Sequence, residues 1–557
     1  MTESAVANRN ATWAGALLDR LYEHGVRDLC LAPGSRSAPL ALAAARRADS
    51  SGVMTVHTHY DERGLGFFAL GLIRATGRPV AVITTSGTAV PNLHPAMAEA
   101  WQSCLPLIAV TADRPPELHD CGANQAIPQE GVFSPHVRTS LNLPAPEAGF
   151  STAWLAGRLD SALAAATAHT DPSPIHLNVP FREPLYGGCE ETADNVPALP
   201  RYAGPPAPVT LPAPTPPLLL VAGQLAEDEA EAALAAAEKT GIPILADLGS
   251  QLRLRQHPCV IDSPELLLAT PAGRAACAEA RQVIQLGGRL TGKRLPAWLA
   301  AHAPRRWLVS RHRAYLDPDW QATAVQTDIP SLCQSLPRTR QAPLPGLAEA
   351  VARVRERRRA LVPEGFAEPA AAARLSRLLP TGMTLFAGNS LPVRALDLFA
   401  ETGSGNRCLT QRGASGIDGL IATAAGHAVR HPTTLMIGDL SALHDLNSLA
   451  LFAAAPQPCI AVVLNNDGGG IFDLLPAHHE GEAHRRLFRM PHGLDFAEAA
   501  AQFGLPYWRC EDVDGLEAAY TEALAHGGGS VIEAVCPPGR GSAQITALLR
   551  ALETKEP

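Results

Sequence analysis

No stretch of this sequence is long and apolar enough to cross a membrane. The longest apolar runs, such as Leu105–Val110 and Ile460–Leu464, fall far short of the roughly 20 residues that a transmembrane helix needs. Such short runs are typical of buried strands. The first residues also lack a basic stretch followed by an apolar one, so we expect no secretory signal. The sequence therefore predicts a cytoplasmic protein without a membrane span.

An excess of basic residues is also absent. The chain has 46 Lys and Arg residues against 54 Asp and Glu, with a formal net charge of -8. A negative total charge argues against nucleic acid or an anionic membrane surface as a partner. The mean hydropathy of +0.02 and the 46% hydrophobic content are those of an ordinary globular protein rather than a disordered one.

Paired cysteine motifs are missing as well. The eleven cysteines are an odd number, and no C-x-x-C pair occurs among them. This distribution is typical of neither a zinc site nor a disulfide framework. We therefore expect buried, reduced thiols, as in a cytoplasmic protein.

At 557 residues the chain is too long for one hydrophobic core. The clearest boundary is a stretch with nine prolines between Pro197 and Pro217, which can form neither a helix nor a central strand. A weaker break follows position 331. We predict a first domain over 1–190, a proline-rich linker over 191–217, a central domain over 218–340 and a last domain over 341–557.

Each predicted domain alternates short β-branched runs with helical periodicity. This alternation indicates an α/β fold made of three doubly wound parallel sheets, each covered by helices on both faces. The predicted strands are Val26–Ala32, Pro79–Thr84, Leu105–Thr111, Ile175–Val179, Leu218–Val221, Ile242–Ala246, Gln282–Leu286, Trp307–Ser310, Thr384–Ala387, Thr433–Ile437, Cys459–Leu464 and Val531–Ala534.

Two polar motifs stand at predicted strand ends in the last domain. Asp439 follows one strand in a GDL motif, and Asn466 follows the next in NNDGGG, with 24 residues between the two motifs. Ligands of open α/β sheets bind at the carboxyl ends of strands, so these side chains are placed to converge. A carboxylate, an amide oxygen and a backbone carbonyl form the hard oxygen set that Mg²⁺ prefers. Either motif alone is common as a helix cap or a turn, but the pair at this spacing is specific.

Several loops at predicted strand ends carry an arginine or lysine beside small polar residues. Arginine binds carboxylates in a bidentate manner, although any one such residue more often forms a surface salt bridge. Such loops in an acidic protein favour substrates with several carboxylates. The five basic loops are APGSRSAP, TADRPPEL, RLTGKR, GNSLPVR and QRGASG, and a sixth loop, GANQAI, adds the amide of Gln125.

The spacing of GDL and NN resembles the motif of the thiamine-diphosphate-dependent enzymes. In that family an Asp, the second Asn and a carbonyl two residues later hold the metal. The resemblance implies that Asp439, Asn466 and Gly468 hold Mg²⁺ or Mn²⁺. The sequence departs from the family at Leu440, where most members have glycine. The cofactor contacts implied by the matched motifs are Ser86, Gly87, Ser415, Gly416, Ile417, Asp439, Leu440, Ser441, Asn466, Gly469 and Ile471.

The same resemblance implies an activating glutamate in the first domain. Thiamine chemistry needs a carboxyl group beside the aminopyrimidine, and such a group works best when buried. Glu62, in HTHYDERGLGF, is the best-placed candidate, although an acidic residue there also suits a helix N-terminus. In the family this glutamate and the metal site of one active centre come from different subunits. We therefore expect a homodimer or homotetramer.

One branch of the family, that of menaquinone biosynthesis, carries GDL. The resemblance to this branch covers nearly the whole chain. Members of the branch decarboxylate 2-oxoglutarate and add the resulting carbanion to isochorismate in a 1,4 sense. For this chain the resemblance implies these two small-molecule substrates. The substrate-binding residues that we assign, without dividing them between the two acids, are Ser35, Arg36, Arg114, Gln125, Lys293, Arg294, Ser390, Arg394, Arg412, Phe472 and Leu475.

Two alternatives remain open at the level of the sequence. One is another thiamine-dependent decarboxylase or carboligase, such as an acetohydroxyacid-synthase-like enzyme, for which we would expect GDG and fewer arginines. The other is a non-catalytic metabolite-binding protein, which would have no reason to combine Glu62 with Asp439 and Asn466.

Overall fold

The computed structural model describes residues 2–168, 171–190, 212–302, 305–312, 316–337, 339–360 and 365–553. These residues form two compact units. Unit 1 comprises Met1–Pro205, Gly413–Arg430 and Asp445–Ala455, and unit 2 comprises Pro206–Arg412, His431–His444 and Pro456–Pro557. Most of the predicted linker, 191–211, lies outside the described residues. The predicted domain boundaries themselves stay a prediction.

Three six-stranded sheets, in which neighbouring strands run parallel, confirm the predicted α/β class. The sheet of unit 1 consists of β1 (Asp28–Leu31), β2 (Thr55–Thr58), β3 (Val80–Thr84), β4 (Leu107–Asp113), β5 (Thr139–Asn142) and β6 (Ile175–Pro180). The central sheet consists of β7 (Leu218–Ala222), β8 (Ile244–Ala246), β9 (Val260–Ile261), β10 (Gln282–Leu286), β11 (Arg306–Ser310) and β12 (Thr323–Gln326). The last sheet consists of β13 (Thr384–Ala387), β14 (Cys408–Thr410), β15 (Thr433–Gly438), β16 (Cys459–Asn465), β17 (Tyr507–Cys510) and β18 (Gly529–Val535).

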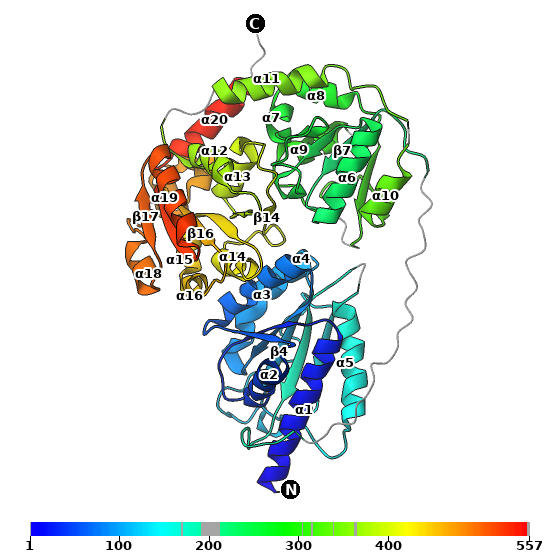
Figure 1. Ribbon diagram of the computed structural model, residues 1–557, viewed down its shortest axis with the longest axis vertical. Coiled ribbons are helices and arrows are strands. Elements are labelled where there is room, and N and C mark those ends of the chain that lie inside the picture. Colours follow the sequence, from blue (N-terminus) through cyan, green and yellow to red (C-terminus); the bar gives the residue numbers. More distant parts are fainter. Residues whose placement is uncertain are drawn as a thin grey trace. The chain divides into compact units, whose positions relative to one another are not determined.

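Helices connect the strands in both units (Figure 1). Those of unit 1 are α1 (Glu3–Glu23), α2 (Ala38–Ser51), α3 (Glu62–Thr76), α4 (His94–Gln102), α5 (Thr152–Ala166), α14 (Leu420–Ala428) and α16 (Leu449–Ala453). Those of unit 2 are α6 (Glu227–Thr240), α7 (Pro264–Ala269), α8 (Pro271–Ala278), α9 (Arg294–His302), α10 (Ile329–Ser335), α11 (Leu347–Ala360), α12 (Glu368–Leu378), α13 (Leu391–Phe399), α15 (Asp439–His444), α17 (Glu482–His484), α18 (Ala497–Gln502), α19 (Val513–His526) and α20 (Arg540–Glu553). Short single-turn helices are η1 (Gly87–Ala89), η2 (Pro91–Leu93), η3 (Pro116–Leu118), η4 (Leu248–Ser250), η5 (Leu446–Ser448), η6 (Gly470–Leu474), η7 (Pro476–Glu480) and η8 (Arg485–Arg489).

The strand order creates one topological switch point in each sheet. The orders are β2-β1-β3-β4-β6-β5, β12-β11-β10-β7-β8-β9 and β14-β13-β15-β16-β18-β17. The chain therefore reverses its direction of winding between β1 and β3, between β7 and β10, and between β13 and β15. Ligands of open α/β sheets bind outside the carboxyl ends of the strands at such points. The last switch point is directly followed by Asp439, which comes after β15.

The sequence predicts the inner strands and misses the edges. The twelve predicted strands correspond to the inner strands, of which each sheet has four. The edge strands were not predicted, and these are β2, β5, β9, β12, β14 and β17. Inner strands are buried throughout, as β3 and β16 are. Most edge strands are short and partly exposed, as β2 and β12 are, so they lack the apolar run that marks an inner strand.

Alternating side chains of the first sheet build two hydrophobic layers. Ala81 and Ile83 of β3 share one core with α1, α2 and α5, which lie on that face. Helix α3 contacts β1, β3 and β4 and covers the opposite face. A sheet covered on both faces explains why its inner strands are continuous apolar runs. The central sheet follows the same plan, with α6 and α10 on one face and α7, α8 and α9 on the other.

Helix α14 packs closely against α3 within unit 1 (Figure 1). A Cβ atom added at Gly71 would overlap the carbonyl oxygen of Thr423, and one added at Gly426 would overlap that of Phe68. These two glycines therefore let the helix backbones approach each other. Glu99 of α4 fixes the loop before α14, since its carboxylate accepts hydrogen bonds from the backbone nitrogens of Gly413 (3.1 Å) and Ala414 (2.6 Å).

Two further expectations can be compared with the structure. No helix among the described residues has both the length and the apolar character needed to cross a membrane. All eleven cysteines are free thiols, and seven of them are buried, as expected for a chain without a disulfide framework. Cys121 and Cys189 differ from the expectation because they are exposed.

The α3–α14 contact leads to a stability prediction. Gly71→Ala should lower the free energy of unfolding by about 1–3 kcal/mol, because the added methyl group overpacks the helix interface. Helix propensity alone acts in the opposite direction, since alanine is favoured over glycine by about 1 kcal/mol in a helix. Gly149→Ala is the matched control, because nothing lies near its added Cβ. Urea unfolding measures both variants, and a Gly71→Ala chain as stable as the control would contradict this packing.

Candidate functional site

The carboxyl ends of β15 and β16 bring Asp439 and Asn466 together in unit 2. The Asp439 Oδ2 atom accepts hydrogen bonds from the backbone nitrogens of Asn466 (3.1 Å) and Gly468 (2.8 Å). Its Oδ1 atom accepts one from the backbone nitrogen of Leu440 at 2.7 Å. Burial raises the pKa of the Asp439 carboxyl, whereas the backbone donors of Gly468 and Leu440 and the nearby His492 act to lower it. The GDL and NN motifs thus form one connected structure at the switch point.

The glycine turn after Asn466 is shaped by the segment with Arg489 and His492, which was not among the predicted site residues. Gly468 has a φ of +123°, and a Cβ atom there would overlap the carbonyl oxygen of Arg489. Arg489 donates a hydrogen bond from Nη2 to the carbonyl oxygen of Asn466 at 2.9 Å, and its own carbonyl accepts one from the nitrogen of Gly469 at 2.7 Å. His492 Nε2 lies 3.3 Å from Asp439 Oδ2. The basic residues after the glycine turn were the available signal for this segment.

The donor atoms at this position fit a divalent cation. The Oδ1 atom of Asn466 is fully buried and has no hydrogen-bond partner among the described residues. A buried, unpartnered amide oxygen beside a buried carboxylate calls for an explanation, and a hard cation with oxygen ligands supplies one. Leu440, Ser441, Gly469 and Ile471, which were predicted as cofactor contacts, all lie on the segments that follow these two strands, and Ser441 is buried.

Three predicted substrate residues gather at the same edge of the last sheet. Ser390 follows β13 with a φ of +71°, an uncommon conformation for a residue other than glycine. Its carbonyl oxygen accepts a hydrogen bond from Arg394 Nη1 at 2.5 Å. Arg412 follows β14 and donates from Nη1 to Asn389 Oδ1 at 3.3 Å. Burial lowers the pKa of Arg394, and the positive charge of Arg412 lowers it further, so the two guanidinium groups lie near each other.

The other predicted substrate residues of unit 2 are Lys293, Arg294, Phe472 and Leu475. Lys293 is exposed, and Arg294 forms an ion pair with Glu553 at 2.7 Å. Phe472 and Leu475 are half-buried beyond the glycine turn, and the ring of Phe472 lies 5.5 Å from that of Phe488 between centroids.

In unit 1 four predicted residues meet at the carboxyl ends of β3 and β4. Ser86 is buried, its hydroxyl accepts a hydrogen bond from Arg114, and its carbonyl oxygen accepts one from Gln125 Nε2 at 2.7 Å. A Cβ atom at Gly87 would lie 2.6 Å from Gln125 Cγ. Buried Gln129, which was not predicted, accepts a hydrogen bond from the nitrogen of Gly87 at 3.0 Å. The loop with Ser86 and Gly87 is thus held in place by side chains that follow β4.

Arg36 and Ser35 follow β1 and already have partners in the chain. Buried Arg36 donates to the carbonyl oxygen of Phe181 at 2.9 Å and to Glu183 Oε1 at 3.1 Å. The Ser35 hydroxyl lies 3.3 Å from the hydroxyl of Tyr186. Burial lowers the pKa of Arg114, and the charge of Arg36 lowers it further. Arg36 and Arg114 therefore contribute positive charge to the same region of unit 1.

Glu62 is the first residue of α3 and is half-buried. The preceding Asp61 caps this helix, since its Oδ1 atom accepts hydrogen bonds from the nitrogens of Arg63 (3.0 Å) and Gly64 (3.3 Å). Glu62 is therefore not needed as the cap. The loop with Ser415, Gly416 and Ile417 also belongs to unit 1, and the Ile417 side chain is 37% exposed, which is unusual for an isoleucine.

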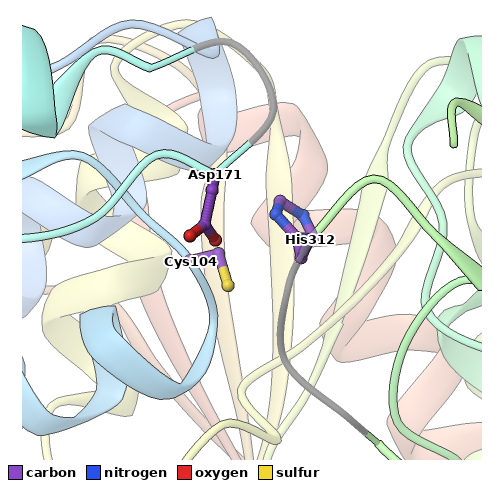
Figure 2. Close-up of side chains that lie close together, drawn as sticks. All are labelled: Cys104, Asp171 and His312. Carbon is purple, nitrogen blue, oxygen red and sulfur yellow. The ribbon is translucent and has the colours of Figure 1, made fainter. Parts of the chain in front are cut away.

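Figure 2 labels Cys104 and Asp171, which lie close together in unit 1, and His312 of unit 2. The Cys104 sulfur and a carboxylate oxygen of Asp171 are within 4.8 Å of each other. Asp171 also forms an ion pair with Arg138. Because an arginine already balances the Asp171 charge, we assign no function to the Cys104 and Asp171 pair.

Comparison with known proteins agrees with this geometry. Three parts of the chain match the family of thiamine pyrophosphate enzymes. Thiamine pyrophosphate is another name for thiamine diphosphate. Its N-terminal TPP binding domain matches residues 11–133, its middle domain residues 219–387 and its C-terminal TPP binding domain residues 394–534. The last match includes Asp439, Asn466 and the glycine turn.

Individual relatives match over almost their entire length. A protein of Halorhodospira halophila named 2-succinyl-5-enolpyruvyl-6-hydroxy-3-cyclohexene-1-carboxylate synthase is 65% identical over 98% of this chain and 99% of the relative. Proteins with the same name from Shewanella frigidimarina and Cronobacter sakazakii are 40% and 41% identical, each over 98% of this chain and 99% of the relative. The chain therefore belongs to the thiamine pyrophosphate enzyme family, within its group of 2-succinyl-5-enolpyruvyl-6-hydroxy-3-cyclohexene-1-carboxylate synthases.

Proposed function

We propose that this chain decarboxylates 2-oxoglutarate and joins the resulting carbanion to isochorismate by 1,4-addition. The products are CO₂ and 2-succinyl-5-enolpyruvyl-6-hydroxy-3-cyclohexene-1-carboxylate, a step of menaquinone biosynthesis. The proposal rests on the cluster of Asp439, Asn466 and Gly468 at a switch point. It is supported by the 65% identity of the chain to a relative that is named as the synthase of this product. Thiamine diphosphate, when bound, supplies the electron sink that the decarboxylation needs.

Asp439, Asn466 and the carbonyl oxygen of Gly468 are the proposed ligands of Mg²⁺ or Mn²⁺. The unpartnered Oδ1 atom of Asn466 supports this proposal, as does the all-oxygen donor set. Mg²⁺ in proteins is usually bound by one or two carboxylates together with phosphate groups of a ligand, rather than by protein ligands alone. Leu440, Ser441, Gly469 and Ile471 of unit 2, and Ser86, Gly87, Ser415, Gly416 and Ile417 of unit 1, are the further proposed cofactor contacts.

Glu62 is the proposed proton-handling group beside the aminopyrimidine of the cofactor. Its position after a complete Asp61 cap supports a role other than helix capping. Its half-buried side chain would become buried if a second subunit covered it, which is the environment that favours a shared proton. We therefore propose a homodimer or homotetramer with active sites between subunits.

The eleven free cysteines suit a reducing compartment, and we propose the cytoplasm.

Arginine side chains are the proposed anchors of the substrate carboxylates. Arg394 and Arg412 lie near each other and repel. Burial and the charge of Arg412 lower the pKa of Arg394, whereas the charge of Asp397 acts to raise it. A dianionic substrate would relieve their mutual repulsion and accept bidentate hydrogen bonds. Ser390 lies beside them. Ser35, Arg36, Arg114 and Gln125 of unit 1 and Lys293, Arg294, Phe472 and Leu475 of unit 2 complete the proposed set.

Product analysis tests the proposed reaction. With thiamine diphosphate, Mg²⁺, 2-oxoglutarate and isochorismate, mass spectrometry should detect the decarboxylated adduct, with one CO₂ released for each adduct formed. Pyruvate is the matched control substrate, because it lacks the second carboxylate that the arginines would bind, and it should react poorly. Efficient reaction of pyruvate without any need for isochorismate would instead indicate an acetohydroxyacid-synthase-like enzyme.

Substitution of Glu62 tests its role in cofactor activation. Glu62→Gln should still bind thiamine diphosphate with Mg²⁺ but should lose about 10²–10⁴-fold in the rate of proton exchange at the cofactor C2 position, measured by NMR. Asp61→Asn is the control, because asparagine caps a helix as well as aspartate does and should keep exchange near the rate of the unsubstituted chain. If Glu62→Gln exchanged this proton at the unsubstituted rate, the assignment of Glu62 would be wrong.

A further inference from the structure

Glu368, the first residue of α12, is a buried acidic side chain near the predicted metal ligands. Acidic residues in the first turn of a helix are commonly exposed, where they interact favourably with the positive end of the helix dipole. Glu368 is only 2% exposed. Among the described residues it forms no ion pair with an arginine or lysine, although burial of a carboxylate without a cation is costly. Helix capping alone therefore does not explain its position.

The Glu368 carboxylate contacts the side chain of Asn466. The Asn466 Nδ2 atom donates a hydrogen bond to Glu368 Oε1. In this hydrogen bond the amide nitrogen of Asn466, and not its amide oxygen, faces Glu368. The Oδ1 atom consequently points the other way, and this is the buried atom that has no hydrogen-bond partner among the described residues.

The backbone of Asn466 is held independently of its side chain. Its nitrogen donates to Asp439 Oδ2 at 3.1 Å, and its carbonyl oxygen accepts from Arg489 Nη2 at 2.9 Å. With the backbone held on both sides, the side-chain torsions are the freedom left to Asn466. The hydrogen bond to Glu368 restricts them.

Two glycines leave room for the Glu368–Asn466 pair. A Cβ atom added at Gly541, in the first turn of α20, would overlap Glu368 Oε2. One added at Gly470 would lie 2.6 Å from Asn466 Nδ2. The neighbouring Ser542 donates a hydrogen bond from its hydroxyl to the carbonyl oxygen of Gly470 at 2.7 Å. The start of α20 therefore packs against both Glu368 and the glycine turn.

We infer that Glu368 is a positioning residue of the metal site, whose carboxylate holds the Asn466 amide with Oδ1 turned toward the cation. This inference rests on the proposed function, in which Asn466 is a metal ligand. Residues that orient metal ligands through hydrogen bonds commonly change metal affinity by about 10–100-fold when substituted. In this role Glu368 acts through Asn466.

Glu368→Gln is the decisive variant. A glutamine side chain has nearly the same shape but carries an amide group, which can donate to the Asn466 oxygen and so stabilise the reversed amide. We expect the Mg²⁺ concentration at half-maximal binding of thiamine diphosphate, measured by tryptophan fluorescence at a fixed cofactor concentration, to rise by about 10–100-fold. This readout does not depend on turnover.

Glu533→Gln is the matched control. Glu533 is 1% exposed and accepts hydrogen bonds from the side chain of the neighbouring Asn465 (2.7 Å), from the nitrogen of Phe496 (2.9 Å) and from the hydroxyl of Tyr507 (2.7 Å). The substitution changes an equally buried carboxylate on the sheet that leads into Asn466, without removing a contact of Asn466 itself. Its Mg²⁺ midpoint should stay near that of the unsubstituted chain, even if its unfolding temperature falls.

The outcomes separate this inference from the proposed function. If the unsubstituted chain bound thiamine diphosphate without any Mg²⁺ dependence, the proposed metal site itself would fail. If that dependence is present but Glu368→Gln keeps the unsubstituted midpoint, or shifts it no more than Glu533→Gln does, the positioning role is wrong. Should Glu368→Gln not fold, Glu368→Asp keeps an acceptor-only group one methylene shorter. Its midpoint should then rise by less than the shift expected for glutamine, and an unchanged midpoint would overturn the inference.

Discussion

A buried carboxylate at the end of an inner strand constrains the whole candidate site. Asp439 is 2% exposed, and its charge can be tolerated there only if hydrogen-bond donors or a cation surround it. Backbone nitrogens of Leu440, Asn466 and Gly468 supply part of that environment. Satisfying Asp439 therefore ties the end of β15 to the end of β16. It also fixes the position of the glycine turn, against which the Arg489 segment packs.

All three sheets have a strand order with a switch point between two inner strands. Candidate residues that lie far apart in the sequence therefore share a position in loops at the carboxyl ends of strands. Loops that follow β1 and β3 carry Ser35, Arg36, Ser86 and Gly87, and loops that follow β13 and β15 carry Ser390 and Asp439. Both strand pairs flank a switch point. Parallel sheets leave a crevice at such points, where polar groups can converge without disturbing the apolar layers between sheet and helices.

The inner strands and the Asp439 and Asn466 pair could be predicted from the sequence, because each depends on local patterns. An inner strand is buried on both faces and so appears as an apolar run, and the two polar motifs follow such runs directly. Edge strands such as β2 lack this pattern because they are partly exposed. Glu368 lies 98 residues from Asn466 in the chain and carries no local sign of their contact. The ion pairs of Arg36 and Arg294 were equally invisible, since their partners Glu183 and Glu553 lie far away in the sequence.

The position of the bound cation tests the central claim most directly. Crystals of the full chain grown with thiamine diphosphate and Mn²⁺ allow the metal to be located by its anomalous scattering. The account predicts one strong peak bonded to a carboxylate oxygen of Asp439, to Oδ1 of Asn466 and to the carbonyl oxygen of Gly468. A peak away from these atoms, or a cofactor bound with no metal at Asp439, would contradict it.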